Sequence, residues 1–355
     1  MTTLPAAKSS THEHVRAYYG STITTTADLQ TSACCVNGSL PTYLKEIQAS
    51  LEPEITERFY GCGSPIPPLL EGRTVLDLGC GTGRDAYICS KLVGETGRVI
   101  GVDMTKEQLE IALRHQAAQA ERFGYKTSNV SLHLGAIEDL ATLGIEDASI
   151  DVVISNCVIN LAPDKRRVFA EALRVLKPGG ELLFSDVFAD RRIPEPLKTD
   201  PVLVGECLAG ALYVEDFRRM MGALGVPDYR VLASRPVTIS NEDIAAKLGP
   251  VRFYSITVRA FKLAGLEDRC EDYGQVASYL GTIQHAPHAF VLDNHHEFLT
   301  GKPMLVCGNT AQMLSATRLA PHFEVQGSRE THFGLFDCSG AAPKTGGDAD
   351  VGECC

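Results

Sequence analysis

The sequence predicts an α/β fold, in which a parallel sheet is built from strands that are joined by crossover helices. Short apolar runs alternate with amphipathic helical patterns between residues 73 and 188. A glycine-rich turn follows the first apolar run directly. These two observations favour an open sheet that binds a ligand at the carboxyl ends of its strands. The expected strands cover residues 74–78, 98–103, 130–135, 151–156 and 181–187.

Two helices between these strands have well-marked ends. Thr105 and Gln108 are spaced as a capping box, and the helix that they open is expected to stop near Gly124. A second helix is expected over residues 164–177, because the Pro-Gly-Gly sequence that follows cannot continue it. Both helices have the length of a crossover connection between parallel strands.

The chain of 355 residues is long enough for two or three domains. We expect residues 1–235 to form the α/β domain, preceded by an N-terminal segment that contains cysteines. Strands at 237–239 and 251–261, without crossover helices, predict a smaller β-rich domain over residues 236–283. Residues 284–355 are expected to form a C-terminal α+β region, with a helix at 310–319 and a flexible tail.

Composition excludes several classes of protein. With 33 basic and 44 acidic side chains the net charge is −11, and the short basic clusters lie beside acidic residues, which argues against a nucleic-acid partner. The N-terminus lacks the apolar core of a secretory signal, and no run of about 18 apolar residues predicts a membrane span. We therefore expect a cytoplasmic protein. Thiols stay reduced there, so 12 cysteines call for a chemical explanation.

The glycine-rich turn has the spacing G-x-G-x-G, with an acidic residue two positions ahead of its first glycine. A dinucleotide fingerprint would instead read G-x-G-x-x-G. Asp103 ends the second strand, where a carboxylate suits a ribose with free hydroxyl groups. The turn is expected to bring the backbone and a helix N-terminus close to a ligand. Its residues are Asp77, Gly79, Gly81, Gly83 and Arg84.

This arrangement resembles S-adenosylmethionine-dependent methyltransferases of the Rossmann-like class I. The resemblance implies S-adenosylmethionine as methyl donor, with Asp77 near its methionine amino group and Asp103 on its ribose. It also implies that residues 135–139 flank the adenine. The residues expected to bind this cofactor are Tyr60, Asp77, Gly79, Gly81, Gly83, Arg84, Asp103, Met104, Ile137, Glu138, Asn156 and Val158.

Three cysteines are placed where they can meet at the same rim. Cys157 follows the fourth strand directly, whereas Cys62 precedes the sheet and Cys207 follows it. Three thiolates form a soft site that suits thiophilic ions, and the closely spaced cysteine pairs of structural zinc sites are missing. Trivalent arsenic fits such a site, because it binds three sulfurs in a pyramid and keeps a lone pair that can attack a sulfonium methyl group.

With these segments the chain resembles the arsenite S-adenosylmethionine methyltransferases over most of residues 15–260. The resemblance implies that Cys62, Cys157 and Cys207 bind trivalent arsenic, and it makes residues 236–283 an arsenic-binding antiparallel domain. It also implies that an N-terminal cysteine, Cys34 or Cys35, takes part in a redox cycle. The matching segments are Asp28-Leu29-Gln30-Thr31, Tyr60-Gly61-Cys62-Gly63, Gly101-Val102-Asp103-Met104-Thr105-Lys106, residues 155–161 and Gly205-Glu206-Cys207-Leu208.

A reaction follows from this resemblance as a hypothesis. Arsenite or its thiol conjugate exchanges onto the three cysteines, and its lone pair attacks the methyl group, with proximity as the main contribution of the enzyme. The transfer oxidises arsenic to the pentavalent state, and a disulfide between Cys62 and Cys34 or Cys35 would return the electrons. Glutathione or the thioredoxin system would then reduce the protein.

Two other functions fit the same residues. A methyltransferase for carbon or oxygen of a small organic molecule would work without metalloid, and a metalloid-sequestering protein would bind arsenic without turnover. Several cysteines also stay outside the proposed chemistry. Cys80 and Cys89 are expected to pack in the core, and the terminal Cys354-Cys355 pair either captures metalloid or is incidental. No partner is evident for Cys270, Cys307 or Cys338.

Overall fold

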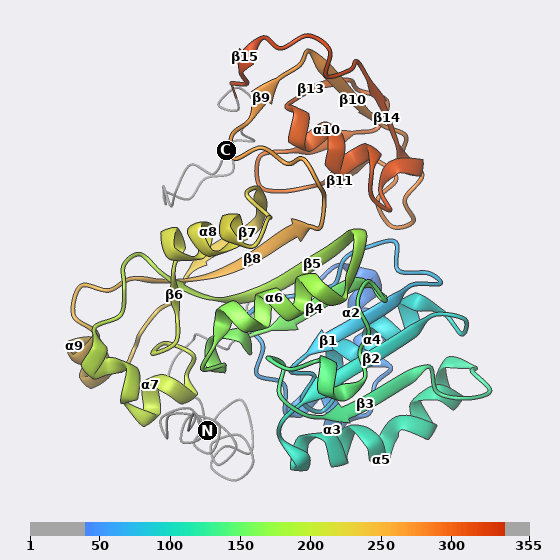
Figure 1. Ribbon diagram of the computed structural model, residues 1–355. Helices are drawn as coiled ribbons and strands as arrows, with labels where there is room; N and C mark the ends of the chain where they lie inside the picture. Colours follow the sequence, from blue (N-terminus) through green and yellow to red (C-terminus); the bar gives the residue numbers. More distant parts are fainter. Residues whose placement is uncertain (1–39, 338–355) are drawn as a thin grey trace.

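The computed structural model describes residues 40–337 of the chain, and its centre is an eight-stranded sheet (Figure 1). Within this range the strands lie in the order β3-β2-β1-β4-β5-β8-β7, and β6 pairs with β5. The strands are β1 (Thr74–Leu78), β2 (Arg98–Asp103), β3 (Val130–Leu134), β4 (Ile150–Asn156), β5 (Leu176–Ala189), β6 (Leu212–Tyr213), β7 (Tyr229–Pro236) and β8 (Phe253–Phe261).

The first five strands are parallel, as the sequence predicts, and two of them have the predicted bounds. The switch of strand order lies between β1 and β4, so the ligand-binding crevice of such a sheet is expected at their carboxyl ends. Successive residues of β1 face opposite sides, since Val75 and Leu76 belong to different apolar clusters. The sheet is therefore buried on both faces.

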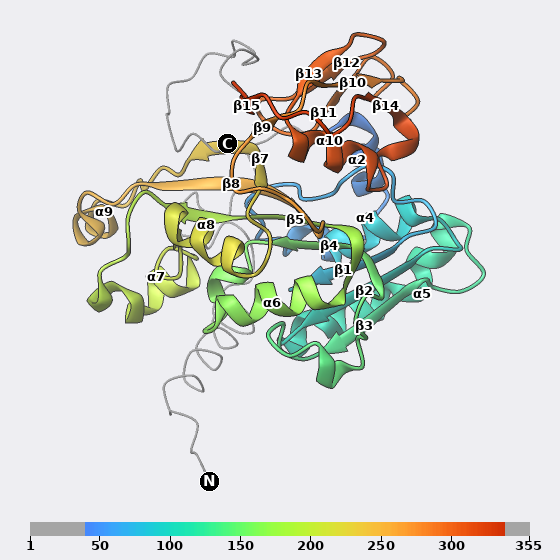
Figure 2. The ribbon, with the colours of Figure 1, turned by 45° about the horizontal axis from the view of Figure 1, so that its top comes forward.

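Helices cover both faces of the sheet. Side chains of α2, α4 and α5 pack in one apolar cluster, and those of α6 and α8 pack in the other. Figure 2 shows α6 and α8 on the same side of the sheet. The α-helices of this part are α2 (Thr42–Ala49), α3 (Pro53–Glu57), α4 (Arg84–Val93), α5 (Lys106–Phe123), α6 (Lys165–Val175), α7 (Pro201–Gly205), α8 (Val214–Ala223) and α9 (Glu242–Leu248).

The predicted helices form, with changes at their ends. Helix α5 ends at Gly124, whose φ of 81° is left-handed, but the Thr105 side chain makes no capping hydrogen bond. The capping-box prediction is therefore wrong in its chemistry. The Asp103 carboxylate instead accepts the backbone N–H of Thr105, the N-cap residue, at 2.7 Å. Helix α6 ends at Val175, and the Pro-Gly-Gly sequence lies inside β5 because the chain turns directly into the strand.

The sequence predicts a separate β-rich domain over residues 236–283, but its longest strand, β8, belongs to the central sheet instead. Strand β8 pairs antiparallel with both β5 and β7, and so extends the central sheet. Residues 237–239 are not a strand, because β7 ends at Pro236. The absence of crossover helices in the sequence thus reflects antiparallel addition to the sheet edge rather than a new sheet.

A C-terminal region, residues 271–337, has its own small core (Figure 1). Its three-stranded antiparallel sheet has the order β13-β10-β14. Helix α10 packs on β10 and β14, and it is the helix expected at 310–319 with an earlier start and an earlier end. Because β10 belongs to this sheet, the region begins before the predicted boundary at residue 284. Its elements are β9 (Glu271–Asp272), β10 (Gln275–Tyr279), β11 (Ala289–Val291), β12 (Glu297–Leu299), β13 (Met304–Val306), α10 (Gly308–Ser315), β14 (Phe323–Gln326) and β15 (Gly334–Leu335).

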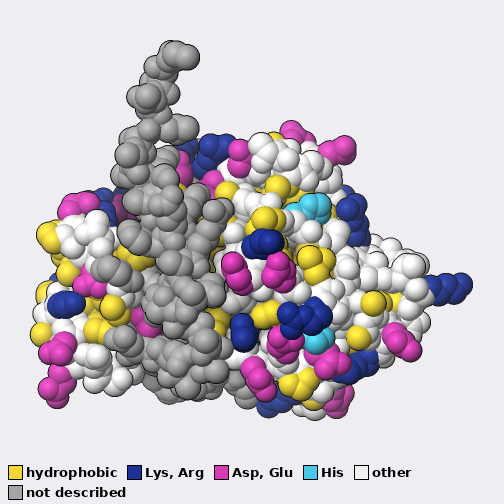
Figure 3. All heavy atoms as spheres, turned by 90° about the horizontal axis from the view of Figure 1, so that it is seen from below, with side chains coloured by type: hydrophobic (Ala, Val, Ile, Leu, Met, Phe, Trp, Pro, Cys, Tyr) yellow, Lys and Arg dark blue, Asp and Glu magenta, His cyan; other side chains and the backbone are white. Residues whose placement is uncertain are grey.

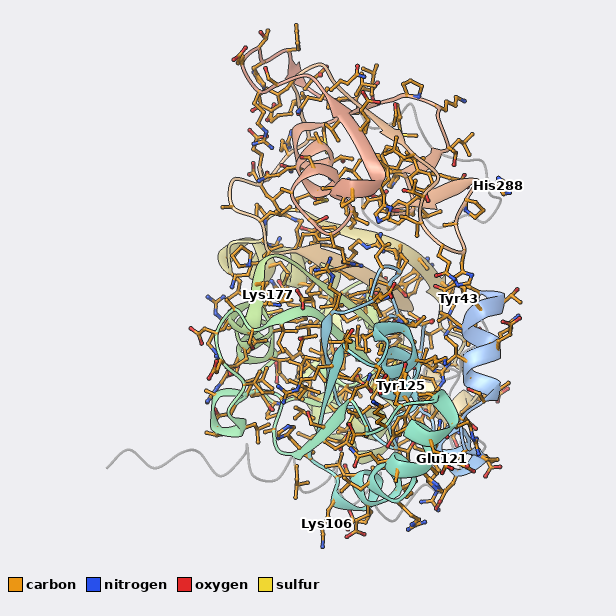
Figure 4. The ribbon with its side chains drawn as sticks, turned by 90° about the vertical axis from the view of Figure 1, so that its right-hand side faces the viewer. Tyr43, Lys106, Glu121, Tyr125, Lys177 and His288 are labelled. Atoms are coloured by element: carbon orange, nitrogen blue, oxygen red, sulfur yellow. A yellow bond between two sulfur atoms is a disulfide. The ribbon has the colours of Figure 1, made fainter. Side chains whose placement is uncertain are left out.

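Polar contacts tie this region to the central sheet. Glu181 on β5 is fully buried and pairs with Arg259 on β8 and with Arg318 of the C-terminal region. Tyr43 on α2 stacks on the His285 ring with centroids 4.3 Å apart, and Figure 4 shows Tyr43 where α2 meets the C-terminal region. The two parts therefore share buried charges as well as apolar surface.

The surface agrees with the charge pattern of the sequence. Figure 3 shows acidic and basic side chains interspersed over the coloured part of the lower face. Between residues 40 and 337 there is no helix with the length and apolar character that a membrane crossing requires.

Candidate active site

A cavity opens at the carboxyl ends of β1, β2 and β4, which is where the sequence places its ligand. Its volume is about 930 Å³ including the opening to solvent. Of the twelve residues predicted to bind the cofactor, Gly83 alone is not in its lining. Gly83 is instead the N-cap of α4, with φ of 90°. The predicted lining residues are Tyr60, Asp77, Gly79, Gly81, Arg84, Asp103, Met104, Ile137, Glu138, Asn156 and Val158.

The glycine turn adopts a backbone that few other residues could adopt. Gly79 has φ of 74°, and a Cβ added there would lie 2.4 Å from the Val158 side chain. Gly81 has φ of 53°, and its N–H donates to the Asp103 carboxylate at 2.8 Å. Asp103 thus holds both the turn and the start of α5, a structural role that its spacing in the sequence does not reveal.

Three carboxylates lie at this end of the cavity: Asp77, Asp85 and Asp103. Burial, together with the charges of Asp85 and Asp103, raises the pKa of Asp77 well above its usual value. One carboxylate oxygen of Asp77 is buried and has no hydrogen-bond partner among residues 40–337. An acceptor of this kind fits a ligand with a cationic amino group. The residues present therefore fit the methionine end of S-adenosylmethionine.

The three predicted arsenic-binding cysteines come together beside the cavity. Cys62 and Cys157 form a disulfide with Cα atoms 5.8 Å apart, and the Cys207 thiol donates to the Cys157 carbonyl oxygen at 3.4 Å. All three are buried in one apolar cluster, and Cys157 lines the cavity. We call these residues the cysteine cluster. Cys62 was expected to pair with Cys34 or Cys35, which lie outside the described residues.

Two of these cysteines have an unusual backbone. Cys157 has φ of 55° and Cys207 has φ of 63°, both in the left-handed region that residues with a Cβ rarely occupy. Such conformations cost free energy and cluster at functional sites. The backbone at both positions is therefore consistent with selection for the place of the sulfur atom.

Asn156 fixes the backbone of the Cys62 segment. Its side-chain oxygen accepts the N–H groups of Cys62 and Gly63 at 3.0 and 3.3 Å, and its amide donates to the Gly63 carbonyl at 2.9 Å. On the other side, Ser255 and Arg235 donate to the Cys62 carbonyl at 2.8 and 2.7 Å. The sequence predicts Asn156 as a cofactor residue only, and it gives no signal for Ser255 or Arg235, which reach the segment through antiparallel pairing.

A titratable pair that the sequence does not reveal lies next to Cys207. Burial raises the pKa of Asp186 to about 7. Burial also lowers the pKa of Lys165, although the charges of Asp186 and Cys207 act in the opposite direction. Asp186 accepts the Asn160 N–H at 3.1 Å, and the Asn160 side chain lies 3.5 Å from the Cys207 carbonyl. Asp186 thus supports the backbone that carries Cys207 through Asn160, whereas the Lys165 amine donates to the Ala162 carbonyl at 3.1 Å.

The remaining candidates behave as the sequence predicts. Cys80 and Cys89 are buried, and burial raises the pKa of both thiols, so they pack as apolar residues. Residues 40–337 contain no group of three or more His, Cys, Asp or Glu side chains suited to a metal ion.

Comparison with known proteins decides the family. A methyltransferase domain model matches residues 69–225, and the arsenite methyltransferase C-terminal domain model matches residues 273–349. An arsenite methyltransferase from Aquipseudomonas alcaligenes is 54% identical over 333 residues, which are 94% of this chain and 96% of the relative. The chain belongs to the arsenite methyltransferase family. An arsenite methyltransferase from Mus musculus is 42% identical and covers 88% of this chain and 82% of its own length.

A solved structure of this family confirms the fold. The arsenic(III) S-adenosylmethionine methyltransferase from Chlamydomonas reinhardtii superposes with a TM-score of 0.82 at 53% identity, covering 84% of this chain and 100% of its own. The Rossmann-like class I fold with an added β-rich C-terminal region is thus confirmed, and so is the resemblance of the sequence to arsenite methyltransferases.

Proposed function

We propose that the protein transfers a methyl group from S-adenosylmethionine to trivalent arsenic bound by the thiolates of Cys62, Cys157 and Cys207. The observation that carries the proposal is the convergence of these three cysteines beside the cavity of a methyltransferase fold. The names of relatives that are 54% and 42% identical support arsenite as the substrate.

The cavity residues divide the work of holding the cofactor. When bound, S-adenosylmethionine supplies a methyl group on a positively charged sulfur. The open carboxylate oxygen of Asp77 would accept the amino group, and Asp103 would hold the ribose. Ile137 and Glu138 would flank the adenine from the cavity wall. No side chain needs to remove a proton, because the attacking lone pair of arsenic carries none.

The disulfide sets the order of events. Three thiolates require that a thiol reductant first delivers two electrons and two protons to the Cys62–Cys157 disulfide. Arsenite then exchanges onto the three thiols: three As–S bonds form, three As–O bonds break, and the thiol protons leave with the hydroxyl groups as three water molecules. Its lone pair forms the As–C bond while the methyl–sulfur bond breaks, and the electron pair of that bond stays on the departing sulfur.

The pentavalent product must regain two electrons. Two thiols can supply them by forming a disulfide, and Cys62 is common to both candidate pairs, with Cys157 or with an N-terminal cysteine, Cys34 or Cys35. The adjacency of Cys62 and Cys157 supports the first pair. We further propose that glutathione or thioredoxin is the reductant and that the protein acts in the cytoplasm.

One assay tests the proposal. The reduced protein is incubated with arsenite, S-adenosylmethionine and a thiol reductant, and the arsenic species and S-adenosylhomocysteine are quantified. We expect methylated arsenic, lost in Cys157→Ser and in Cys207→Ser but kept in Cys89→Ser, whose buried cysteine lies outside the cysteine cluster. Full methylation by either cluster variant would refute the three-thiolate site. If the protein bound arsenite but formed no S-adenosylhomocysteine, it would be a metalloid-sequestering protein. If it methylated only organic acceptors, its substrate would be a small organic molecule.

A further inference from the structure

The C-terminal region contains a second pair of cysteines, away from the cysteine cluster. Cys270 directly precedes β9 and Cys307 directly precedes α10. Both are buried, with exposed fractions of 4% and 0%, and their side chains hydrogen-bond to each other. We call them the C-terminal cysteine pair. Neither lines the cavity, and the proposed methyl transfer makes no use of them.

Polar groups of Thr310 and Arg230 surround the Cys307 sulfur, in addition to the Cys270 thiol. Cys307 is the N-cap of α10, and its sulfur accepts the Thr310 backbone N–H at 3.5 Å and lies 3.3 Å from the Thr310 hydroxyl oxygen. An Nη atom of Arg230, on β7, lies 3.9 Å from the same sulfur. Arg230 is itself held by Asp228 at 2.8 Å and Asp293 at 3.2 Å. A helix N-terminus and a guanidinium both favour the thiolate.

The other buried cysteines show that burial alone does not produce this state. Burial raises the pKa of Cys80 and Cys89 well above the usual value for a thiol. At Cys307 the hydrogen bond from Cys270, the charge of Arg230 and the bonds from Thr310 outweigh burial and lower the pKa to about 4. The pair therefore combines one thiolate with one thiol at neutral pH.

A short cover lies over Cys270. The Phe336 N–H donates to the Cys270 carbonyl at 2.8 Å, and β15 pairs with β9 through two residues only. The large side chains of this cover point outward, since Phe333 is 65% and Leu335 is 61% exposed. A segment with so few buried contacts opens locally at low cost. A small neutral ligand thus has a route to the pair.

We propose that Cys270 and Cys307 form a second thiophilic site, which binds monomethylated trivalent arsenic through two sulfurs. This inference rests on the proposed function, because that reaction supplies the ligand. Methylarsonous acid has two exchangeable hydroxyl groups, which match a thiol and a thiolate. Two As–S bonds form, two As–O bonds break, and one water and one hydroxide leave without any change of oxidation state. Inorganic arsenite has three such groups, and among the described residues no third His, Cys, Asp or Glu ligand joins the C-terminal cysteine pair.

The test uses the full chain on a background in which other reactive cysteines are serine. These are the cysteine cluster and the cysteines outside residues 40–337, so that Cys80, Cys89, Cys270 and Cys307 remain. Native mass spectrometry of the reduced protein with methylarsonous acid should show one bound equivalent, and arsenite should bind at least tenfold more weakly. Cys307→Ala and Cys270→Ala should abolish binding, whereas Cys89→Ala should not. No binding by the background chain, or binding that survives Cys307→Ala, overturns the proposal.

A second measurement needs no substitution. Methylarsonous acid should protect the Cys307 peptide of the natural chain from iodoacetamide at least tenfold, with the Cys89 peptide as control. Equal labelling of the Cys307 peptide with and without the ligand also overturns the proposal. Failure of the methylation assay with intact protection would instead overturn the proposed function alone.

Discussion

The clearest test of how the site is built is the replacement Asn156→Ala. The Asn156 side chain makes three hydrogen bonds to the backbone of Cys62 and Gly63. At about 0.5–1.5 kcal/mol each, these bonds stabilise the closed segment by roughly 1.5–4.5 kcal/mol. A loss of about 2 kcal/mol raises the open fraction about 30-fold.

Hydrogen exchange of the peptide that contains Cys62, in reduced protein, measures this opening directly. We expect the exchange rate of this peptide to rise at least tenfold in Asn156→Ala, and arsenite methylation to fall with it. Ser255→Ala removes a single hydrogen bond to the Cys62 carbonyl and is the matched control, with a smaller rise. Lost activity with unchanged exchange would refute the reasoning, because Asn156 would then act on a ligand rather than on the segment.

Three further predictions concern the cavity, the buried charges and pH. Gly79→Ala should weaken S-adenosylmethionine binding in calorimetry much more than Gly81→Ala, because only the former places a Cβ against Val158. Glu181→Gln leaves two buried arginines without a carboxylate and should lower the free energy of unfolding by about 3–5 kcal/mol in urea titrations, against under 1 for the exposed Glu110→Gln. The raised pKa of Asp186, about 7, means that the folded state keeps a proton that the unfolded chain has lost. Stability should therefore fall as pH rises from about 4 to 7, by up to about 4 kcal/mol, and Asp186→Asn should flatten this slope. Equal S-adenosylmethionine binding by both glycine variants would contradict the argument from Val158. Equal losses of unfolding free energy in both glutamate variants would contradict the argument from buried charge. An unchanged slope of stability against pH in Asp186→Asn would contradict the argument from its pKa.

Local patterns predicted the parallel half of the molecule well. The glycine turn and the strand before it have the expected places because their signals lie within a few residues of each other. The same holds for the acid that ends β2, which lines the cavity as expected. What such patterns leave open is the second role of a residue: Gln108 has the spacing of a cap but lines the cavity.

Contacts between segments that are far apart in the chain could not be predicted from the sequence. Arg235 on β7 and Ser255 on β8 hold the Cys62 carbonyl from 173 and 193 positions away. The antiparallel pairings of β8 with β5 and of β7 with β8 place them there, and no periodicity of the sequence specifies these pairings. The wrong prediction of a separate domain over residues 236–283 has the same cause, because the sequence of an antiparallel strand does not indicate which sheet the strand joins. The burial that shifts the pKa of Asp186 likewise depends on the whole fold.

The left-handed backbone at Cys157 and Cys207 separates what the fold prefers from what the chemistry requires. At most buried positions alanine is the more stabilising of the two smallest residues, but where φ is positive glycine avoids a cost of about 1–2 kcal/mol. Replacement by glycine at these two positions should therefore be more stable than replacement by alanine. The backbone at both positions thus suits a residue without a Cβ, and cysteine occupies them at a conformational cost, which is consistent with a requirement for the sulfur atoms.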